Sequence, residues 1–375
     1  MTAASPFEIL LVTSPGLESP LIEEARESGF VVSNQIAGGV LLQGGWPDVW
    51  RANLILRGAA RVLVRIGSFH AAHLAQLDKR SRSFPWGHFL RADVPVHVEA
   101  TCKKSRIYHS KAAAQRITTA ITEELGAPIK ENAEVIIKAR IENDLVTLSI
   151  DTSGELLHKR GSKQAMAKAP MRENMAALFL RMCGYNGNEP VLDPMCGSGT
   201  FVIEAAEWAV GLLPGRNRSF AFEKLATFDE KAWQILKSSP PLREGVEQQH
   251  ARFLGSDRDA GAITASQANA ARAGVSHLTH FEKKTVSEIT PPPGPPGLVV
   301  CNPPYGTRIG EEKKLQALYA ALGTSLRERF KGWRVGVITS NERLARAAGL
   351  PFGKPSAPIL HGGLRISLFQ TDPLK

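Results

Sequence analysis

The chain has 375 residues, of which 43% are hydrophobic and 22% charged, as is normal for a soluble folded protein. This length is enough for two or three domains. No apolar run approaches the roughly eighteen residues that cross a bilayer, and the first residues lack the basic-then-apolar order of a secretory signal. The sequence therefore predicts a cytoplasmic protein without a membrane segment.

The charge balance is strongly basic. Lys and Arg number 46 against 36 Asp and Glu, an excess of 46 − 36 = 10. Such an excess favours a polyanionic partner, because every phosphate that is neutralised releases counterions. Much of it is concentrated in two clusters, which favours a binding surface over general solubility. One cluster contains Lys103, Lys104, Arg106, His109 and Lys111, and the other Lys159, Arg160, Lys163, Lys168 and Arg172.

The first 66 residues alternate short strands and helices. Strands are predicted over 7–12, 38–42 and 61–66, and helices over 16–28 and 46–59. Antiparallel strands with helices on one side form a small α+β sandwich.

Residues 67–165 are predicted as a second unit. It has a strand over 94–101, an amphipathic helix over 110–125 and a hairpin of strands 134–141 and 145–151. Pro95 near the start of the first strand predicts an edge position, because proline donates no ladder hydrogen bond. Glu142-Asn143-Asp144 has favourable chemistry for the hairpin turn.

From residue 166 the pattern becomes a repeat of strand and helix. A helix is predicted over 171–183, and the strand candidates are 189–192, 252–256, 277–281, 297–301, 334–339 and 365–371. Buried apolar strands that alternate with helices predict a mainly parallel, doubly wound sheet. The expected fold class is thus α/β, with a C-terminal Rossmann-like domain over 166–375.

A glycine turn joins the strand at 189–192 to a helix over 201–209. The turn contains Asp193, Met195, Cys196, Gly197, Ser198, Gly199 and Thr200. Its two glycines let the backbone approach a ligand at the helix N-terminus, but neither GxGxxG nor a P-loop is present. An aspartate before such a turn suits a ligand that has a cation and no pyrophosphate, such as a methionine amine or a sulfonium-bearing cofactor.

Asp257 follows the next strand. A carboxylate there can accept both hydroxyls of a ribose, although it could also merely cap the following helix. Asp259 is the better candidate for that cap.

An apolar strand stops at Asn302-Pro303-Pro304-Tyr305. The two prolines force a rigid exit at the carboxyl edge of the sheet, where ligands of α/β proteins bind. There the Asn302 side-chain oxygen and the Pro303 carbonyl can accept both hydrogens of a planar amine and favour attack by its lone pair. Tyr305 offers a ring on which a base can stack. A merely rigid loop is the alternative.

The four cysteines are Cys102, Cys183, Cys196 and Cys301. They form no CxxC pair and lie near no histidine cluster, so no metal site is expected. Cys196 and Cys301 could be nucleophiles for carbon methylation, but their places in a glycine turn and a buried strand favour structural roles.

LDPMCGSGTFVIEAA and CNPPYGTRIG resemble the paired motifs of class I methyltransferases that act on the N2 amine of guanine in RNA. LHKRGSKQAMAKAPMRENMAA resembles the segment before their cofactor loop, SRIYHSKAAAQRI their THUMP RNA-binding domain, and ANLILRGAARVLVRI their ferredoxin-like domain. The resemblance is greatest to stand-alone members that act on 23S rRNA. It implies a ferredoxin-like domain over 1–66, a THUMP domain over 67–165 and a methyltransferase domain over 166–375.

The resemblance also implies S-adenosylmethionine (SAM) as cofactor. Asp193, Gly197 and Gly199 would line its site, Asp257 would hold its ribose, and Asn302, Pro303 and Tyr305 would hold guanine. Family members usually have an aspartate for the adenine amine where this chain has Thr285, whose hydroxyl would make a weaker contact.

Other functions are compatible with these features. A THUMP domain also suits tRNA acceptor stems, so tRNA is the alternative RNA. A chain that kept the fold without activity could act in ribosome assembly. Adenine-N6 or glutamine methylation suits NPPY in principle, but the RNA-binding half argues against a protein substrate.

Overall fold

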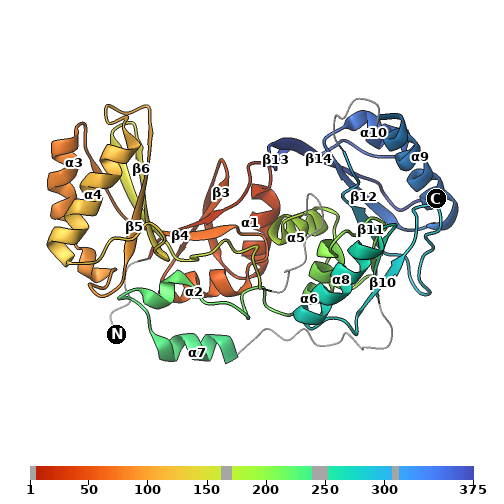
Figure 1. Cartoon of the computed structure of the whole chain (residues 1–375), viewed down its shortest axis with the longest axis horizontal. Helices are drawn as coiled ribbons and strands as arrows, with labels where there is room; N and C mark the ends of the chain where they lie inside the picture. Colours follow the sequence, from red (N-terminus) through yellow and green to blue (C-terminus); the bar gives the residue numbers. More distant parts are fainter. Residues whose placement is uncertain (1–5, 162–170, 239–251, 306–311) are drawn as a thin grey trace. The chain divides into compact units, whose positions relative to one another are not determined.

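The computed structural model describes residues 6–161, 171–238, 252–305 and 312–375. The chain forms two compact units (Figure 1). The first unit contains Met1–Thr13, Leu21–Leu157 and Pro214–Ser239, and the second unit contains Ser14–Pro20, His158–Leu213 and Pro240–Lys375. Lys163, Lys168 and the GTRIG part of the second motif lie outside the described residues. None of the helices in the described ranges is long and apolar enough to cross a membrane.

The first unit is built on a seven-stranded sheet with the order β2-β3-β1-β4-β7-β6-β5. Its strands are β1 (Phe7–Val12), β2 (Val31–Ile36), β3 (Gly39–Gly44), β4 (Arg61–His70), β5 (Val96–Lys103), β6 (Val135–Glu142) and β7 (Leu145–Asp151). Its helices are α2 (Trp46–Ile55), α3 (Leu74–Arg82), η1 (Trp86–His88), α4 (Ser110–Leu125), η2 (Ala221–Lys224) and α7 (Glu230–Ser238), with most of α1 (Glu18–Glu27).

Strand β4 makes this sheet continuous. It pairs with β1 through Arg61–Val64 and with β7 as far as His70, with a register shift between Arg65 and Gly67. The sequence prediction ended this strand at residue 66 and placed a domain boundary there, and the boundary falls inside β4. Gly67 fits this crowded position because a Cβ would lie 2.6 Å from the Phe84 ring.

Several predicted features of the first unit are confirmed. The helix 110–125 and the strands 7–12 and 145–151 have the predicted bounds. β5, which follows Pro95, is an edge strand, and β6 and β7 form the predicted antiparallel hairpin. Asn143 and Asp144 form its turn with φ values of 52° and 61°. β2 and α3 were not predicted.

The second unit is built on another seven-stranded sheet, with the order β10-β9-β8-β11-β12-β14-β13. Its strands are β8 (Val191–Asp193), β9 (Phe253–Asp257), β10 (Thr279–Lys283), β11 (Leu298–Cys301), β12 (Arg334–Thr339), β13 (Ile359–His361) and β14 (Leu364–Gln370). Its helices are α5 (Glu173–Met182), α6 (Thr200–Ala209), α8 (Ala260–Ala273), α9 (Glu312–Arg329) and α10 (Glu342–Ala347).

The pairing confirms the predicted doubly wound sheet. β10, β9, β8, β11 and β12 are parallel, and β14 is antiparallel to both of its neighbours. Successive strands β8, β9 and β10 extend the sheet in one direction, and β11 and β12 extend it in the other. The strand order thus reverses between β8 and β11, and crevices at such reversals are where open α/β sheets bind ligands.

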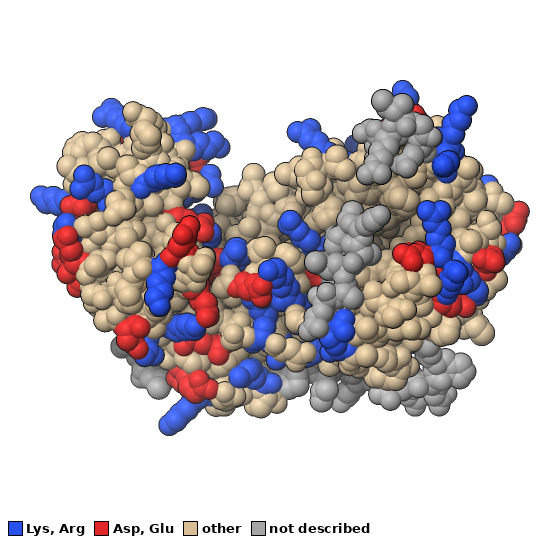
Figure 2. Space-filling view, viewed as in Figure 1, with Lys and Arg blue, Asp and Glu red and all other residues tan. Residues whose placement is uncertain are grey.

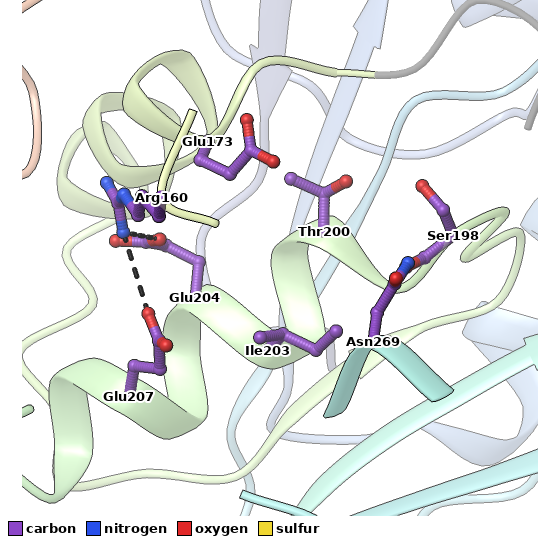
Figure 3. A pocket seen from close by; sticks show the side chains of 8 residues that line it. All are labelled: Arg160, Glu173, Ser198, Thr200, Ile203, Glu204, Glu207 and Asn269. Carbon is purple, nitrogen blue, oxygen red and sulfur yellow. Dashed lines mark hydrogen bonds and ion pairs between the residues drawn. The ribbon is translucent and has the colours of Figure 1, made fainter. Parts of the chain in front are cut away.

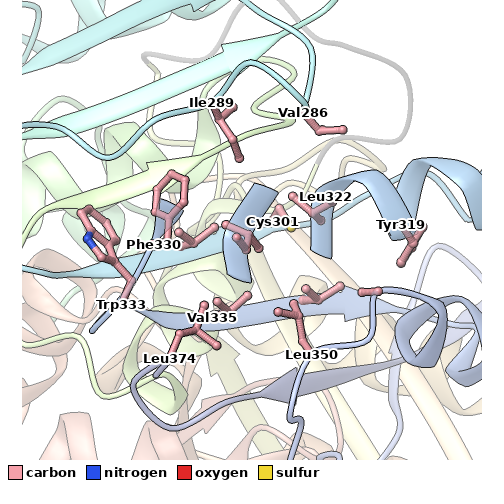
Figure 4. Close-up of a cluster of buried hydrophobic side chains, with 14 of the residues drawn as sticks. Val286, Ile289, Cys301, Tyr319, Leu322, Phe330, Trp333, Val335, Leu350 and Leu374 are labelled. Carbon is pink, nitrogen blue, oxygen red and sulfur yellow. The ribbon is translucent and has the colours of Figure 1, made fainter. Parts of the chain in front are cut away.

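A buried apolar cluster fixes one face of this sheet against α9 (Figure 4). Val299 and Cys301 of β11 and Val335 and Val337 of β12 meet the buried face of the helix, including Leu322. All four residues of β11 are buried, and alternate ones face this cluster. The strand is therefore a rigid base for Asn302 at the carboxyl edge of the sheet.

Candidate cofactor and acceptor site

Three candidate residues lie at the carboxyl ends of neighbouring strands. Asp193 is the last residue of β8, Asp257 is the last residue of β9, and Asn302 follows the end of β11. β8 pairs with β9 on one side and with β11 on the other. The structure therefore brings all three together where the strand order reverses, which agrees with the sequence-based prediction of their positions.

The glycine turn after β8 is tightly constrained. Gly199 is the N-cap of α6 and has a φ of 81°, and a Cβ there would lie 3.1 Å from both Phe281 and Ser266. A side chain would thus be strained by both its backbone conformation and its neighbours. Ser198 and Thr200 beside it are buried, and the partly buried Met195 packs against the core cluster.

Two polar residues of α8 fix this turn by hydrogen bonds to its carbonyl groups. The Ser266 hydroxyl donates to the Gly197 carbonyl at 2.8 Å, and the Asn269 amide donates to the Ser198 carbonyl at 3.0 Å. Neither residue was predicted from the sequence. Their signal is two polar residues three positions apart on the buried face of an alanine-rich helix.

Asp193 carries a carboxyl group into the floor of the site. It is 2% exposed, and its Oδ1 accepts the Met195 N–H at 3.0 Å. Burial, with a smaller contribution from the charge of Asp257, raises the pKa of Asp193 to about 8, although the Met195 N–H opposes the shift. A buried carboxyl with so little compensation is suited to pairing with a cationic ligand group.

Asp257 and Asp259 have different roles at the end of β9. Asp257 accepts the Gly197 N–H at 3.1 Å with one oxygen and the Asp259 N–H at 3.0 Å with the other. Asp259 is the N-cap of α8 and accepts the Gly261 N–H, which confirms the predicted cap. Asp257 therefore connects the end of β9 to the glycine turn.

Thr285 lies two residues after the end of β10. Its N–H and its hydroxyl both donate to the same oxygen of Glu288 at 2.8 Å. These bonds, with the N–H as the larger influence, lower the pKa of Glu288, which is therefore ionised at neutral pH. The Thr285 hydroxyl is thus occupied by its bond to Glu288. The Glu288 carboxylate beside it is exposed and can accept a hydrogen bond from a ligand.

The acceptor segment presents an unusual polar group. The Asn302 side-chain oxygen is buried and has no hydrogen-bond partner among the described residues. Burial raises the pKa of Tyr305, and a hydrogen bond donated by the Asn302 amide group, which leaves its oxygen unpaired, partly offsets that shift. Pro303 is buried and Pro304 is exposed. An unpaired buried carbonyl oxygen is costly, and a ligand N–H is the partner that such an oxygen can accept.

The two cysteines near this edge are poorly suited to nucleophilic attack. Cys196 and Cys301 are 6% and 0% exposed, and burial raises the pKa of each thiol well above its ordinary value. A thiolate is the reactive form of cysteine. These thiols therefore stay neutral and pack as small hydrophobic groups.

One prediction about the basic residues needs correction. Arg160, predicted to bind RNA, is 5% exposed, and its guanidinium pairs with Glu204 and lies 3.7 Å from Glu207, both buried on α6 (Figure 3). Its position in the chain did not reveal this, because its acidic partners come more than forty residues later. Lys159 and Arg172 from the same cluster are exposed.

The other predicted basic cluster lies on the surface of the first unit. The residues of this cluster are all exposed and extend from the end of β5 through the first turn of α4: Lys103, Lys104, Arg106, His109 and Lys111. Tyr108 between them is 77% exposed, and its ring is tilted against that of His109 with ring centroids 5.0 Å apart. Figure 2 shows Lys and Arg side chains gathered at the upper end of this unit in the view.

The fold and this edge define a class I methyltransferase domain. The family described as the RMKL-like methyltransferase domain matches residues 160–354, and the RlmL ferredoxin-like domain matches residues 8–63. The first match covers more than half of the chain, which therefore belongs to the RMKL-like methyltransferase family.

Similar proteins support this assignment. The ribosomal RNA large subunit methyltransferase K/L of Vibrio campbellii is 33% identical over 90% of this chain, but only 49% of that relative is covered. This chain thus spans about half the length of such relatives. The Synechocystis protein slr0064, named as a candidate RNA methyltransferase, is 31% identical over 95% of this chain and 94% of its own length.

A solved structure shares the whole fold. SMU.472, described as a candidate methyltransferase in complex with SAH, superposes with a TM-score of 0.88 at 25% identity, over 99% of both chains. This likeness covers both units of the fold, not only the methyltransferase domain.

Proposed function

We propose that this protein transfers a methyl group from SAM to the exocyclic N2 amine of a guanosine in RNA, with 23S rRNA as the substrate and the cytoplasm as its location. The observation that carries the proposal is the buried Asn302 oxygen without a partner among the described residues, at the same sheet edge as Asp193 and Asp257. The names of the relatives, which include RNA and ribosomal RNA methyltransferases, support RNA as the substrate.

The cofactor residues suit SAM. The Asp193 carboxyl would pair with the methionine ammonium, because it is buried and accepts a single backbone N–H at one oxygen. Asp257 would accept the ribose hydroxyls. The turn formed by Gly197, Ser198 and Gly199, with Cys196 and Thr200 beside it, would lie against the methionine portion. The likeness to a structure that holds SAH supports this placement.

The adenine end would be recognised through Glu288. The resemblance assigns the adenine amine to position 285, but the Thr285 hydroxyl is bonded to Glu288. The ionised Glu288 carboxylate can accept an adenine N–H, and Thr285 would act by holding that carboxylate in place. When bound, SAM would supply an electrophilic methyl on its sulfonium.

The acceptor segment would activate the target nitrogen by accepting its hydrogens. The Asn302 oxygen and the Pro303 carbonyl would each accept one N–H, which draws the lone pair out of conjugation with the guanine ring. Tyr305 would stack on the base. No strong general base is needed, because the proton becomes acidic when the nitrogen is methylated. A guanine within an RNA helix would first have to be flipped out.

The RNA-binding surface would be the exposed basic cluster of the first unit, with residues 67–165 acting as a THUMP domain. Lys159 and Arg172 would add contacts from the second unit. These exposed cations suit phosphate groups, which bind mainly through charge.

Nucleoside mass spectrometry of 23S rRNA and tRNA from a deletion strain tests the function directly. We expect one N2-methylguanosine to disappear from 23S rRNA and to return when the gene is restored. A loss confined to tRNA would move the substrate to tRNA, and no loss in either RNA would exclude guanine-N2 methylation. An assembly factor without activity would also fail to bind SAM in calorimetry.

The role of Asn302 is tested by Asn302→Ala in the purified protein. Turnover should fall about 100- to 1000-fold, because an acceptor used in the transition state is removed. RNA affinity, measured by filter binding, should change little. Equal losses in both quantities would show that this segment binds RNA and does not act on the amine.

A further inference from the structure

The loop that contains most of the basic cluster has an unfavourable backbone conformation, which needs stabilising contacts from its neighbours. We call residues 103–109, from the last residue of β5 to the N-cap of α4, the basic loop. Lys104 has a φ of 47°, in the left-handed region that side chains other than glycine rarely adopt. Ile107 is the buried side chain of this loop, at 4% exposure, whereas its cations and aromatic groups are exposed. Burial therefore anchors the loop at Ile107 and does not explain the backbone conformation at Lys104.

Asp144, in the turn of the β6–β7 hairpin, supplies much of the support. Its Oδ1 accepts the Arg106 N–H at 2.8 Å, and its own N–H donates to the Ser105 hydroxyl at 3.0 Å. That hydroxyl donates in turn to the Lys103 carbonyl at 3.0 Å. The Asp144 carbonyl accepts the Ala71 N–H at 2.9 Å, which ties the turn to the end of β4.

The guanidinium of Arg106 is less constrained than its backbone. Its Nε lies 3.7 Å from the Asp144 Oδ2, and the Arg106 side chain is 79% exposed against 28% for Asp144. Asp144 therefore fixes the main chain of the basic loop and leaves the cationic group accessible.

Glu142 in the same hairpin provides a contrast. Its carboxylate pairs with Arg140 at 2.6 Å and lies 3.5 Å from the Lys103 ammonium, so it contacts the side chains of its neighbours. The hydrogen bond from Arg140 is the main influence that lowers the pKa of Glu142, which is ionised at neutral pH. Glu142 thus reduces the positive charge of the surface without ordering the loop.

We propose that Asp144 is a positioning residue for RNA binding: by fixing the backbone of the basic loop, it presents the loop's cations to RNA phosphates. The inference rests on the proposed RNA substrate. It runs against simple electrostatics, in which the removal of any acidic residue from a cationic surface strengthens the binding of a polyanion.

Three variants separate position from charge. Asp144→Gly removes the acceptor for the Arg106 N–H but places a glycine directly after Asn143, which is the favoured order for a turn with two positive φ values. Asp144→Asn removes the charge and keeps an acceptor oxygen. Glu142→Gln removes a charge that contacts the Lys103 ammonium but accepts no backbone N–H of the loop in the described contacts. Thermal unfolding should be similar for all three, because the hairpin is retained.

Affinity is measured by filter binding with an unmodified 23S rRNA transcript between about 50 and 200 mM salt. Asp144→Gly should bind about five- to tenfold more weakly, because the loop must be ordered on binding. The slope of log affinity against log salt should also fall by about one for a lost phosphate contact. Asp144→Asn should bind at least as tightly as the wild type, and Glu142→Gln about twofold more tightly at low salt.

Equal binding by Asp144→Gly and Asp144→Asn would overturn the positioning role. A double variant, Lys104→Gln with Lys111→Gln, separates the proposal that the basic cluster binds RNA from the proposal that Asp144 positions the basic loop. If it binds RNA as tightly as the wild type, the basic cluster is not the RNA surface and both proposals fail. If it weakens binding while Asp144→Gly does not, only the inference about Asp144 fails.

Discussion

At the scale of one residue, burial of the Asp193 carboxyl raises its pKa and links ligand binding to the release of a proton. Its carboxyl is almost wholly buried, and burial raises its pKa to about 8. At pH 7 a group with that pKa is about nine-tenths protonated in the free protein. A ligand ammonium beside it favours the charged carboxylate and lowers its pKa. Binding of the ligand must then expel the proton.

We therefore expect SAH, which carries the same ammonium as SAM, to release close to one proton on binding at pH 7 and fewer as the pH rises past about 8. Isothermal titration calorimetry in buffers of different ionisation enthalpy measures this number. Asp193→Asn serves as the control and should bind more weakly without proton release. Tight binding by the wild type with the same heat in every buffer would show that Asp193 does not pair with the ammonium.

Whether a site residue could be predicted from the sequence depended on what positions it. Asp193, Asp257 and Asn302 end or follow apolar strands, so their place at the carboxyl edge of a mainly parallel sheet could be predicted from the sequence. Ser266 and Asn269 are positioned by the buried face of α8, and contacts of that kind depend on packing between distant elements. The burial of Arg160 depends in the same way on α6.

At the scale of elements, α6 is buried on every side and still carries two carboxylates. Arg160 pairs with Glu204 and lies 3.7 Å from Glu207, so it provides positive charge beside both. Removal of one partner from a buried ion pair leaves charge in a low-dielectric environment and usually costs more than an exposed pair is worth.

Arg160→Gln should lower the free energy of unfolding by about 3 kcal/mol at pH 7. Urea unfolding measures this loss, and the exposed pair of Arg346 with Glu342 supplies a matched control. Arg346→Gln should change stability by less than about 0.5 kcal/mol. An Arg160→Gln protein of unchanged stability and reduced RNA affinity would restore the sequence-based assignment of Arg160 to RNA.

Elements with strong periodicity were predicted well, whereas those stabilised by pairing were not. The helix α4 and the strands β1, β7 and β12 have the predicted bounds because apolar spacing and turn residues delimit them. β2 was missed because it is an exposed edge strand with little apolar alternation. β4 runs past residue 66 because β7 offers it a partner, which no local signal in β4 indicates.

At the scale of the whole molecule, each unit is assembled from separated chain segments. After α6 the chain leaves the second unit, and Pro214–Ser239 belong to the first unit. In this segment the ring centroids of Phe222 and Phe228 lie 6.3 and 6.0 Å from that of Trp50 in α2. The Phe222 ring also packs edge to face against Trp233. Arg218 donates to the carbonyls of Ser153 and Leu156. A division of the chain into consecutive domains places this segment with the methyltransferase domain.

These contacts predict how fragments of the protein will behave. A fragment of residues 1–157 lacks the segment that covers Trp50, so it should bind a hydrophobic dye and unfold at a lower urea concentration. Fusion of residues 214–239 through a flexible glycine-serine linker should restore a cooperative transition, followed by tryptophan fluorescence and circular dichroism. Phe222→Ala in the fused segment should remove about 3 kcal/mol of that gain, as expected for a buried phenylalanine. Identical unfolding midpoints with and without the segment would show that the first unit is complete at residue 157.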